Sequence, residues 1–259
     1  MKLKKILAVF LSMVCVFALC ACGQQKAAAP KDGAKPAGKQ IKVGFAQVGS
    51  ESEWRTANTN NIKAAAKKAN VNLQFSDAQQ KQENQIKAIR SFIASKVDVI
   101  AFCPIVATGW DTVLKEAKDA KIPVILVDRG IKGNDDLYVC HIFADAKKEG
   151  GDAFNWVDKY MKDQKKAPRS GSQYNIAILE GTVGSSVAAD RLTGFKDAIK
   201  KADDGSKYNV LLSQTGEYTR AKGAEVMESF LKSDKDRIDV LFACNDDMAL
   251  GAIQAIEAA

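Results

Sequence analysis

Hydrophobic and polar positions follow a repeating block pattern along the chain from Ile41 onward. Short runs rich in Val, Ile and Phe are apolar at consecutive positions, and polar-rich stretches separate them. Such runs are typical of strands buried under helices on each side, as in a parallel sheet. The predicted strands are 41–46, 72–76, 98–102, 122–127, 137–143, 174–179, 208–213 and 238–243.

The stretches between these runs predict amphipathic helices. Ile86, Ile89, Arg90 and Ile93 stand at the i, i+3, i+4, i+7 spacing of one helix face. The spacing of successive strands matches βαβ units, so the pattern predicts an α/β, doubly wound fold. A long helix and a polar loop interrupt this order over 144–173, after which the βα pattern resumes. We therefore expect two lobes of similar architecture, 41–144 and 145–259.

The amino-terminal residues follow a different pattern. Three lysines within the first five residues precede an apolar run over 6–21, in which Ser12 is the one polar residue. This order is typical of a secretory signal, and the run is shorter than the ~20 residues of a transmembrane helix. It ends in LCAC at 19–22, which resembles the lipobox of bacterial lipoproteins.

We therefore expect residues 1–21 to be a lipoprotein signal peptide and Cys22 to carry the lipid. The alternative is an ordinary secreted protein with a cysteine near its cleavage site. Either interpretation places the mature chain outside the cytoplasm, and lipidation would anchor it to the cell membrane. Residues 22–40 are rich in Ala, Lys, Gly and Pro and predict a flexible tether.

The charge pattern argues against nucleic acid as a partner. The chain holds 38 Lys and Arg against 31 Asp and Glu. Because residues 1–21 contain three lysines and no acidic residue, the mature chain has a net charge of +4. The charges are interspersed and form no basic stripe with interleaved aromatic residues.

Three cysteines remain after Cys22, namely Cys103, Cys140 and Cys244. They form no CxxC pair, and His141 is the single histidine, so too few ligands are present for a zinc site. Each cysteine lies at or near the end of an apolar run. We expect each to be a buried free thiol, with a disulfide as the alternative, and we expect no metal or cofactor.

Polar and aromatic residues follow the carboxyl ends of the predicted strands, where parallel sheets bind ligands. Asp, Asn and Arg side chains can bond paired hydroxyl groups, and Trp and Tyr can pack on the C–H face of a sugar ring. The pattern therefore favours sugar recognition. The segments are Gly49–Arg55, Asp128–Arg129, Gly181–Ser186 with Asp190–Arg191, Gly216–Arg220 and Asn245–Asp247.

Several of these residues also allow a structural interpretation. Asp246 would serve as a cap of the last helix, and Glu217 with Arg220 would form a surface pair. The Trp54 side chain would be partly buried and pack against neighbouring residues. The GTVGSS segment at 181–186 would either cradle a phosphate or form a tight strand-to-helix turn.

The sequence contains no recognisable catalytic arrangement. His141 lies inside an apolar run, so we expect a structural role, and neither GxSxG nor a Ser/His/Asp order is present. Asp128 stands directly beside Arg129, which suits it to hold a hydroxyl rather than to donate a proton as in glycosidases. We therefore expect a binding protein and not an enzyme.

Five segments carry a resemblance to a known family: GFAQVGSESEWR, DAQQKQENQIKAIRSF, VATGWDTVLKEAKDAKIPVILVDR, LEGTVGSSVAADR and CNDDMALGAIQAI. In this order they resemble the periplasmic sugar-binding proteins of ABC transporters, of the ribose-binding-protein type, and most of all the galactofuranose-binding members. The resemblance implies two Rossmann-like lobes of the type I periplasmic binding protein fold. A monomer would close on a monosaccharide and deliver it to an ABC permease. The implied ligand-binding residues are Glu51, Ser52, Trp54, Arg55, Asp128, Arg129, Arg191, Tyr218 and Asn245.

The sequence departs from the family after its last predicted helix. Family members continue with another strand and an Asp-Gly loop, then return to the first lobe, and they cross between lobes three times. Here one crossing is expected, near 144–145. We therefore expect the chain to be incomplete at its carboxyl end. An unpaired strand edge and uncovered helix faces would then weaken folding or binding.

Two other functions use the same pair of lobes. A sensory module would present the sugar to a membrane receptor or kinase, and the sequence leaves this alternative open. A transcriptional repressor would carry an amino-terminal helix-turn-helix, whereas here the signal and the tether occupy that position.

Overall fold

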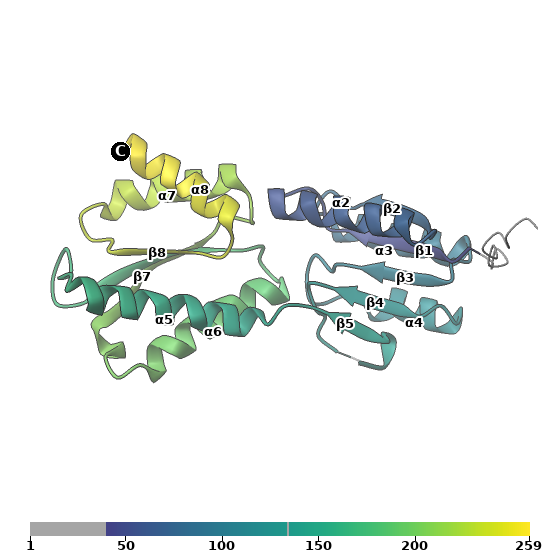
Figure 1. The fold of residues 1–259 in the computed structure, drawn as a ribbon, viewed down its shortest axis with the longest axis horizontal. Helices are drawn as coiled ribbons and strands as arrows, with labels where there is room; N and C mark the ends of the chain where they lie inside the picture. Colours follow the sequence, from purple (N-terminus) through teal and green to yellow (C-terminus); the bar gives the residue numbers. More distant parts are fainter. Residues whose placement is uncertain (1–39, 134) are drawn as a thin grey trace, which may run out of the picture. The chain divides into compact units, whose positions relative to one another are not determined.

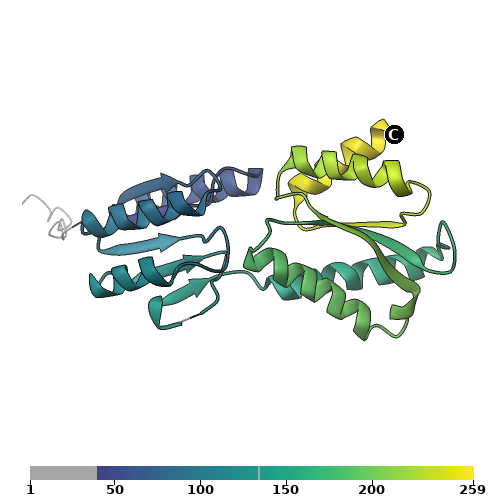
Figure 2. The ribbon, with the colours of Figure 1, turned by 180° about the vertical axis from the view of Figure 1, so that it is seen from behind.

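The computed structural model describes residues 40–133 and 135–259. The predicted signal peptide, the lipidated Cys22 and all of the tether except Gln40 lie outside the described residues. Residues from Gln40 to Ala259 form one compact unit. The described residues contain two parallel sheets, each with its own helices, which we call the first and the second lobe (Figures 1 and 2).

The first lobe has a five-stranded parallel sheet in the order β2-β1-β3-β4-β5. Its strands agree with the predicted runs, except that the fifth is short, because Leu137 belongs to a preceding 3-10 turn and is buried there. The elements are β1 (Lys42–Gln47), α2 (Glu53–Lys68), β2 (Asn72–Asp77), α3 (Gln82–Ala94), β3 (Val99–Phe102), α4 (Asp111–Asp119), β4 (Val124–Val127), the 3-10 turn (Asp135–Leu137) and β5 (Cys140–Ile142).

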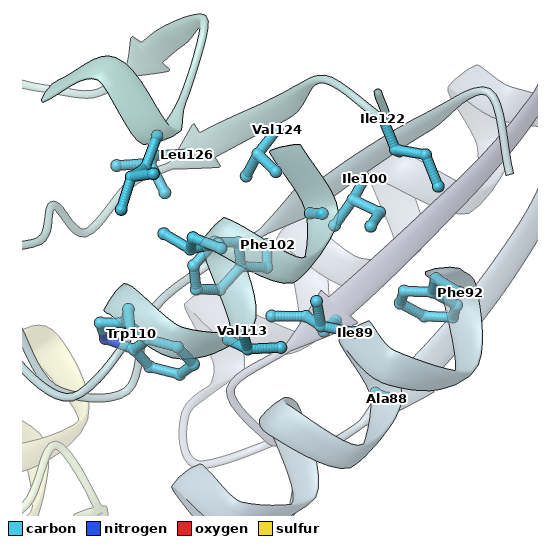
Figure 3. Packing of buried hydrophobic residues seen from close by; sticks show 14 of the residues in the cluster. Ala88, Ile89, Phe92, Ile100, Phe102, Trp110, Val113, Ile122, Val124 and Leu126 are labelled. Atoms are coloured by element: carbon cyan, nitrogen blue, oxygen red, sulfur yellow. The ribbon is translucent and has the colours of Figure 1, made fainter. Parts of the chain in front are cut away.

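Helices α3 and α4 cover one face of this sheet. Ile89 and Val113 from the helices pack with Phe102 and Leu126 from the strands in a continuous apolar core (Figure 3). The opposite face lies against α2, whose one buried side chain among the described residues is Arg55. Phe45 of β1 and Ala101 of β3 point to this face and are also buried, so the predicted burial on both faces is correct for these central strands.

The second lobe has a three-stranded parallel sheet in the order β7-β6-β8. Helices α5 and α6 lie on one face and α7 and α8 on the other (Figures 1 and 2). Strand β6 is therefore buried on both faces, as its uninterrupted apolar run predicted. The elements are α5 (Ala146–Gln164), β6 (Tyr174–Glu180), α6 (Ser186–Lys201), a 3-10 turn (Gly205–Lys207), β7 (Tyr208–Thr215), α7 (Arg220–Asp234), β8 (Val240–Ala243) and α8 (Asp246–Ala258).

The chain passes from the first sheet to the second between β5 and α5, close to the predicted crossing. Asp145 caps α5 there, because its side chain accepts the Lys148 N–H at 2.9 Å. Strand β5 is the edge strand of its sheet, and Cys140 on it is exposed. The expectation that all three cysteines are buried is therefore wrong for Cys140 and correct for Cys103 and Cys244, and all three are free thiols.

Three apolar side chains of α8 are exposed, namely Leu250, Ile253 and Ile256, and Leu250 lines the cavity described below. Over the described part of the chain, no helix combines the length and the apolar character needed to cross a bilayer. The same residues hold no cluster of three or more His, Cys, Asp or Glu arranged to bind a metal.

Candidate ligand-binding site

A cavity of about 590 Å³ lies between the carboxyl ends of strands from both lobes. Residues that follow β1 and β4 form its first-lobe side, and residues that follow β6, β7 and β8 contribute to its second-lobe side. The nine residues implied by the resemblance all line it: Glu51, Ser52, Trp54, Arg55, Asp128, Arg129, Arg191, Tyr218 and Asn245. Segments up to 194 residues apart are thus brought together because parallel strands end at one edge of each sheet.

The first turn of α2 positions two charged residues of the first lobe. Ser52 is the N-cap of α2, and its hydroxyl accepts the Arg55 N–H at 3.1 Å. This turn places Glu51 and Arg55 on one side of the helix start, where Arg55 Nε donates to Glu51 Oε1 at 3.0 Å. Arg55 Nη2 donates to Asp128 Oδ2 at 2.7 Å, so the guanidinium bridges two carboxylates.

The turn after β4 positions Asp128 and Arg129. Asp128 has a φ of +64°, in the left-handed region that Asp tolerates better than most residues. Arg129 is 2% exposed, and its guanidinium donates to the Ile105 carbonyl at 3.0 Å and to Glu51 Oε1 at 3.5 Å. It also lies 5.2 Å from the centre of the Tyr218 ring, so a buried cation of the first lobe faces an aromatic ring of the second.

On the second-lobe side of the cavity, hydrogen bonds fix the side chains of Arg191 and Asn245. Arg191 donates from Nη1 to the Cys244 carbonyl at 2.7 Å and from Nε to Glu149 Oε2 at 2.8 Å. Asn245 caps α8 by accepting the Met248 N–H at 2.9 Å, and its amide nitrogen donates to the Tyr218 carbonyl at 2.9 Å. Asn245 thus ties the turns after β7 and β8 together.

Tyr218 is buried against the glycine that follows β6. A Cβ on Gly181 would lie 2.0 Å from Tyr218 Cζ, so the ring can occupy its place only because residue 181 has no side chain. Burial raises the pKa of the Tyr218 phenol to about 12. The hydroxyl therefore keeps its proton at neutral pH and can donate a hydrogen bond.

Each arginine that lines the cavity is paired with a carboxylate. Arg55 pairs with Glu51 and Asp128, Arg129 with Glu51, Arg191 with Glu149, and Arg220 with Asp247. Positive charge is therefore already balanced before any ligand enters. A neutral, hydroxyl-bearing ligand suits this arrangement better than an anion, which would have to displace one of the carboxylates.

Two buried polar atoms of this network have no partner among the described residues, Glu51 Oε2 and Arg55 Nη1. Buried polar groups are nearly always hydrogen-bonded, because an unmade bond costs ~1–3 kcal/mol. One of these atoms is an acceptor and the other a donor, and both belong to residues of the cavity wall. A ligand hydroxyl can satisfy both kinds of group.

Trp54 is 54% exposed, with its ring 4.8 Å from the Arg55 guanidinium. Part of the ring is therefore covered and part is free, so this exposure does not decide between packing and ligand contact for Trp54. Because Trp54 lines the cavity while much of its surface is free, the ring can contact a ligand there.

A family model described as a periplasmic binding protein domain matches residues 43–259. The chain belongs to the periplasmic binding protein family. Its relatives include the galactofuranose-binding protein YtfQ of Escherichia coli, which is 50% identical over 222 residues, covering 85% of this chain and 66% of the relative. The chain therefore spans about two thirds of the length of this relative.

Two solved structures are similar over 84% of this chain and 69% of theirs. One is a protein from Mycobacterium smegmatis in complex with β-D-fucofuranose, with 52% identity and a TM-score of 0.78. The other is the binding protein of an arabinose ABC transporter from Shewanella sp. ANA-3, bound to α- and β-L-arabinofuranose, with 49% identity and a TM-score of 0.77. The relatives are binding proteins and not enzymes, and the predicted fold class is confirmed.

In this periplasmic binding protein, the cap of α8 and the ion-pair partner of Arg220 differ from those that the sequence suggested. Asn245, and not Asp246, caps α8, because the amide oxygen of Asn245 accepts the N–H three residues on. Arg220 pairs with Asp247 and not with Glu217. Arg220 and Asp247 belong to the strand-end segments that the sequence marked, but not to the nine implied ligand-binding residues, and Glu149 was missed altogether. Asp247 could have been found, since it stands in the same Asn-Asp-Asp segment as Asn245.

The GTVGSS segment of this periplasmic binding protein is a strand-to-helix turn between β6 and α6, which was one of its two interpretations. Two of its groups bond to the first lobe. The Gly184 carbonyl accepts the Ala107 N–H at 2.8 Å, and the Ser186 hydroxyl accepts the Gly130 N–H at 2.8 Å. His141 also has a structural contact, with Nε2 3.2 Å from the Asp128 carbonyl oxygen.

Proposed function

We propose that this chain binds a neutral monosaccharide, galactofuranose or a similar hexose or pentose, in the cavity between its lobes. The observation that carries the proposal is the pair of buried unpartnered atoms, Glu51 Oε2 and Arg55 Nη1, in a cavity whose arginines are already paired. A sugar hydroxyl would donate to the Glu51 oxygen and another would accept from Arg55. Trp54 would pack on the C–H face of the ring.

The known ligands of the relatives support a furanose ring. The two similar structures described above hold fucofuranose and arabinofuranose, and the E. coli relative is named for galactofuranose. Each of these three relatives is about 50% identical over 84–85% of this chain. The cavity volume of about 590 Å³ accommodates one monosaccharide.

We further propose that the protein is an extracytoplasmic lipoprotein and a monomer, with the lobes divided near residues 144 and 145. The lipid on Cys22 would hold the lobes near the membrane, where the closed, loaded form would meet an ABC permease. The amino-terminal pattern and the family membership support this role.

A thermal-shift screen tests the ligand class. Galactofuranose, galactose, ribose and arabinose are added at millimolar concentration, and we expect one of them to raise the Tm by about 5 °C, because a ligand at 100 times its Kd stabilises by ~2.7 kcal/mol. Galacturonate and galactose 6-phosphate serve as anionic controls and should give no shift, since every arginine of the cavity has a carboxylate partner. A flat response to all neutral sugars would contradict the proposal.

Two exposed tryptophans offer a matched pair of variants for calorimetry. We expect Trp54→Ala to weaken binding of the sugar found in the screen about tenfold or more, because the stacking face is lost. Trp156→Ala removes a ring that is 64% exposed, on α5 outside the cavity, and should leave the affinity unchanged. Equal affinities of the two variants would remove Trp54 from the site.

A further inference from the structure

A carboxylate of the second lobe is bonded to the start of a helix in the first lobe. Asp247 lies in the first turn of α8, and its Oδ2 accepts the backbone N–H of Glu53 at 2.9 Å. Glu53 is the first residue of α2, 194 positions earlier in the chain. Asp247 is 7% exposed, so the contact is largely shielded from water.

The physical setting favours this bond. The first N–H groups of a helix have no partner within the helix, and its N-terminus carries partial positive charge. Ser52 satisfies the Arg55 N–H, and the Asp247 carboxylate satisfies that of Glu53. From its own lobe, Arg220 Nη2 donates to Asp247 Oδ1 at 3.0 Å and so orients the carboxylate toward α2.

The two turns joined by this bond both carry residues of the cavity. Ser52, Trp54 and Arg55 stand at the start of α2, and Asn245 caps the helix that carries Asp247. The bond can exist only while α2 and α8 are together. Unlike the two neutral bonds from Gly184 and Ser186, it joins the lobes through a charged group.

We propose that Asp247 is a latch that holds the two lobes closed over the cavity, acting as a positioning residue rather than as a ligand contact. The role in ligand retention rests on the proposed binding of a monosaccharide. When the lobes open, the bond from the Glu53 N–H to Asp247 breaks and water becomes the acceptor of this N–H. The ion pair between Asp247 and Arg220 stays intact, because both residues belong to the second lobe. The latch therefore governs how long the closed state lasts, and with it the rate at which the sugar leaves.

The latch is tested first without any sugar. Amide-resolved hydrogen exchange by NMR on the full chain should show protection of the Glu53 N–H, and Asp247→Ala should make it exchange about tenfold faster. Asp246→Asn removes the adjacent negative charge, which makes no hydrogen bond to the first lobe within residues 40–133, and should leave the Glu53 exchange rate unchanged. Equal exchange rates in the wild type and Asp247→Ala would overturn the proposal.

Two further variants separate a latch from a merely structural residue. Arg220→Ala removes the orienting partner and keeps the acceptor, so its Glu53 exchange rate should lie between those of the wild type and Asp247→Ala. Where Asp247→Ala does not fold, Asp247→Ser replaces it, since serine keeps a polar group in the first turn of α8 but has a shorter side chain. Glu53 exchange as slow in Asp247→Ser as in the wild type would likewise overturn the latch.

The sugar arm uses stopped-flow fluorescence with the ligand found in the screen. We expect Asp247→Ala to release the sugar about tenfold faster, with the association rate nearly unchanged. A lower association rate with unchanged release would contradict a latch. The hydrogen-exchange experiment needs no sugar. A failure to bind any sugar therefore counts against the proposed function alone. An unprotected Glu53 amide counts against the latch alone.

Discussion

Cys103 lies at the carboxyl end of β3, completely buried, with its sulfur 3.5 Å from Asp128 Oδ2. Burial raises the pKa of the Cys103 thiol from its ordinary value of 9.0 to about 11, although the nearby Arg55 and Arg129 act in the opposite direction. Burial likewise raises the pKa of Cys244 to about 11. At the residue scale, the buried thiols therefore stay protonated and unreactive at neutral pH.

This shift predicts a loss of stability at alkaline pH. The unfolded thiol ionises near pH 9 and the folded one near 11, so the free energy of unfolding falls as the pH rises from 9 to 11, by at most ~1.4 kcal/mol per pH unit per thiol. Cys103→Ala should flatten this decline in urea unfolding curves measured between pH 8 and 11. Cys140→Ala controls for removing a thiol, and parallel curves for the wild type and Cys103→Ala would contradict the expectation.

At the scale of elements, helices α5 and α6 approach each other so closely that their backbones touch. A Cβ on Gly194 would lie 1.8 Å from the Lys147 carbonyl oxygen, and one on Gly150 would lie 2.0 Å from that of Arg191. The glycines thus allow α6 to lie directly against α5. The same crossing brings Arg191 of α6 to Glu149 of α5 at the cavity wall.

Gly194→Ala should push the two helices apart. We expect it to lower the free energy of unfolding by roughly 1–3 kcal/mol or more, because the contact is with backbone that cannot turn aside. Gly151→Ala on the facing helix is the matched control, since its Cβ would meet the Gly194 carbonyl oxygen at an ordinary 3.7 Å. It should be neutral or stabilising by ~0.5–1 kcal/mol, since alanine favours the helix. Urea denaturation of both variants measures the difference.

At the scale of the whole molecule, each lobe has an apolar core of its own, and the polar cavity residues connect the two. The first-lobe core contains residues of the first sheet with α3 and α4, whereas the second lobe has one cluster on each face of its sheet. Contacts between the lobes include the polar bonds of Asp247 and Ser186 and the packing of Arg129 on the Tyr218 ring.

The proposed anchor is also a property of the whole molecule. In a bacterial host that processes lipoproteins, the wild type should be recovered in the membrane fraction and released by detergent. Cys22→Ser should be recovered in the soluble fraction or retain its signal peptide, because no thiol accepts the lipid. Cys140→Ser controls for the loss of a cysteine, and Cys22→Ser remaining in the membrane at its mature mass would contradict the lipid anchor.

The apolar runs were sufficient to predict the strands and the parallel sheets. Strands of this length leave few other ways to bury consecutive Val, Ile and Phe residues. The resemblance also identified nine residues that line one cavity, since polar residues after parallel strands must meet at one edge. The apolar runs could not show that Cys140 is exposed, because edge strands and central strands have similar apolar runs.

The fold class, the order of the elements and the set of side chains available at the strand ends follow from the sequence. How these side chains pair depends on the tertiary structure. Arg129 faces Tyr218 of the other lobe, Arg220 takes Asp247 rather than its neighbour Glu217, and Asp247 reaches Glu53. Periodicity along a chain indicates which face of an element is buried. A bond from a backbone N–H to a carboxylate 194 positions away depends instead on distances that only the packed lobes define.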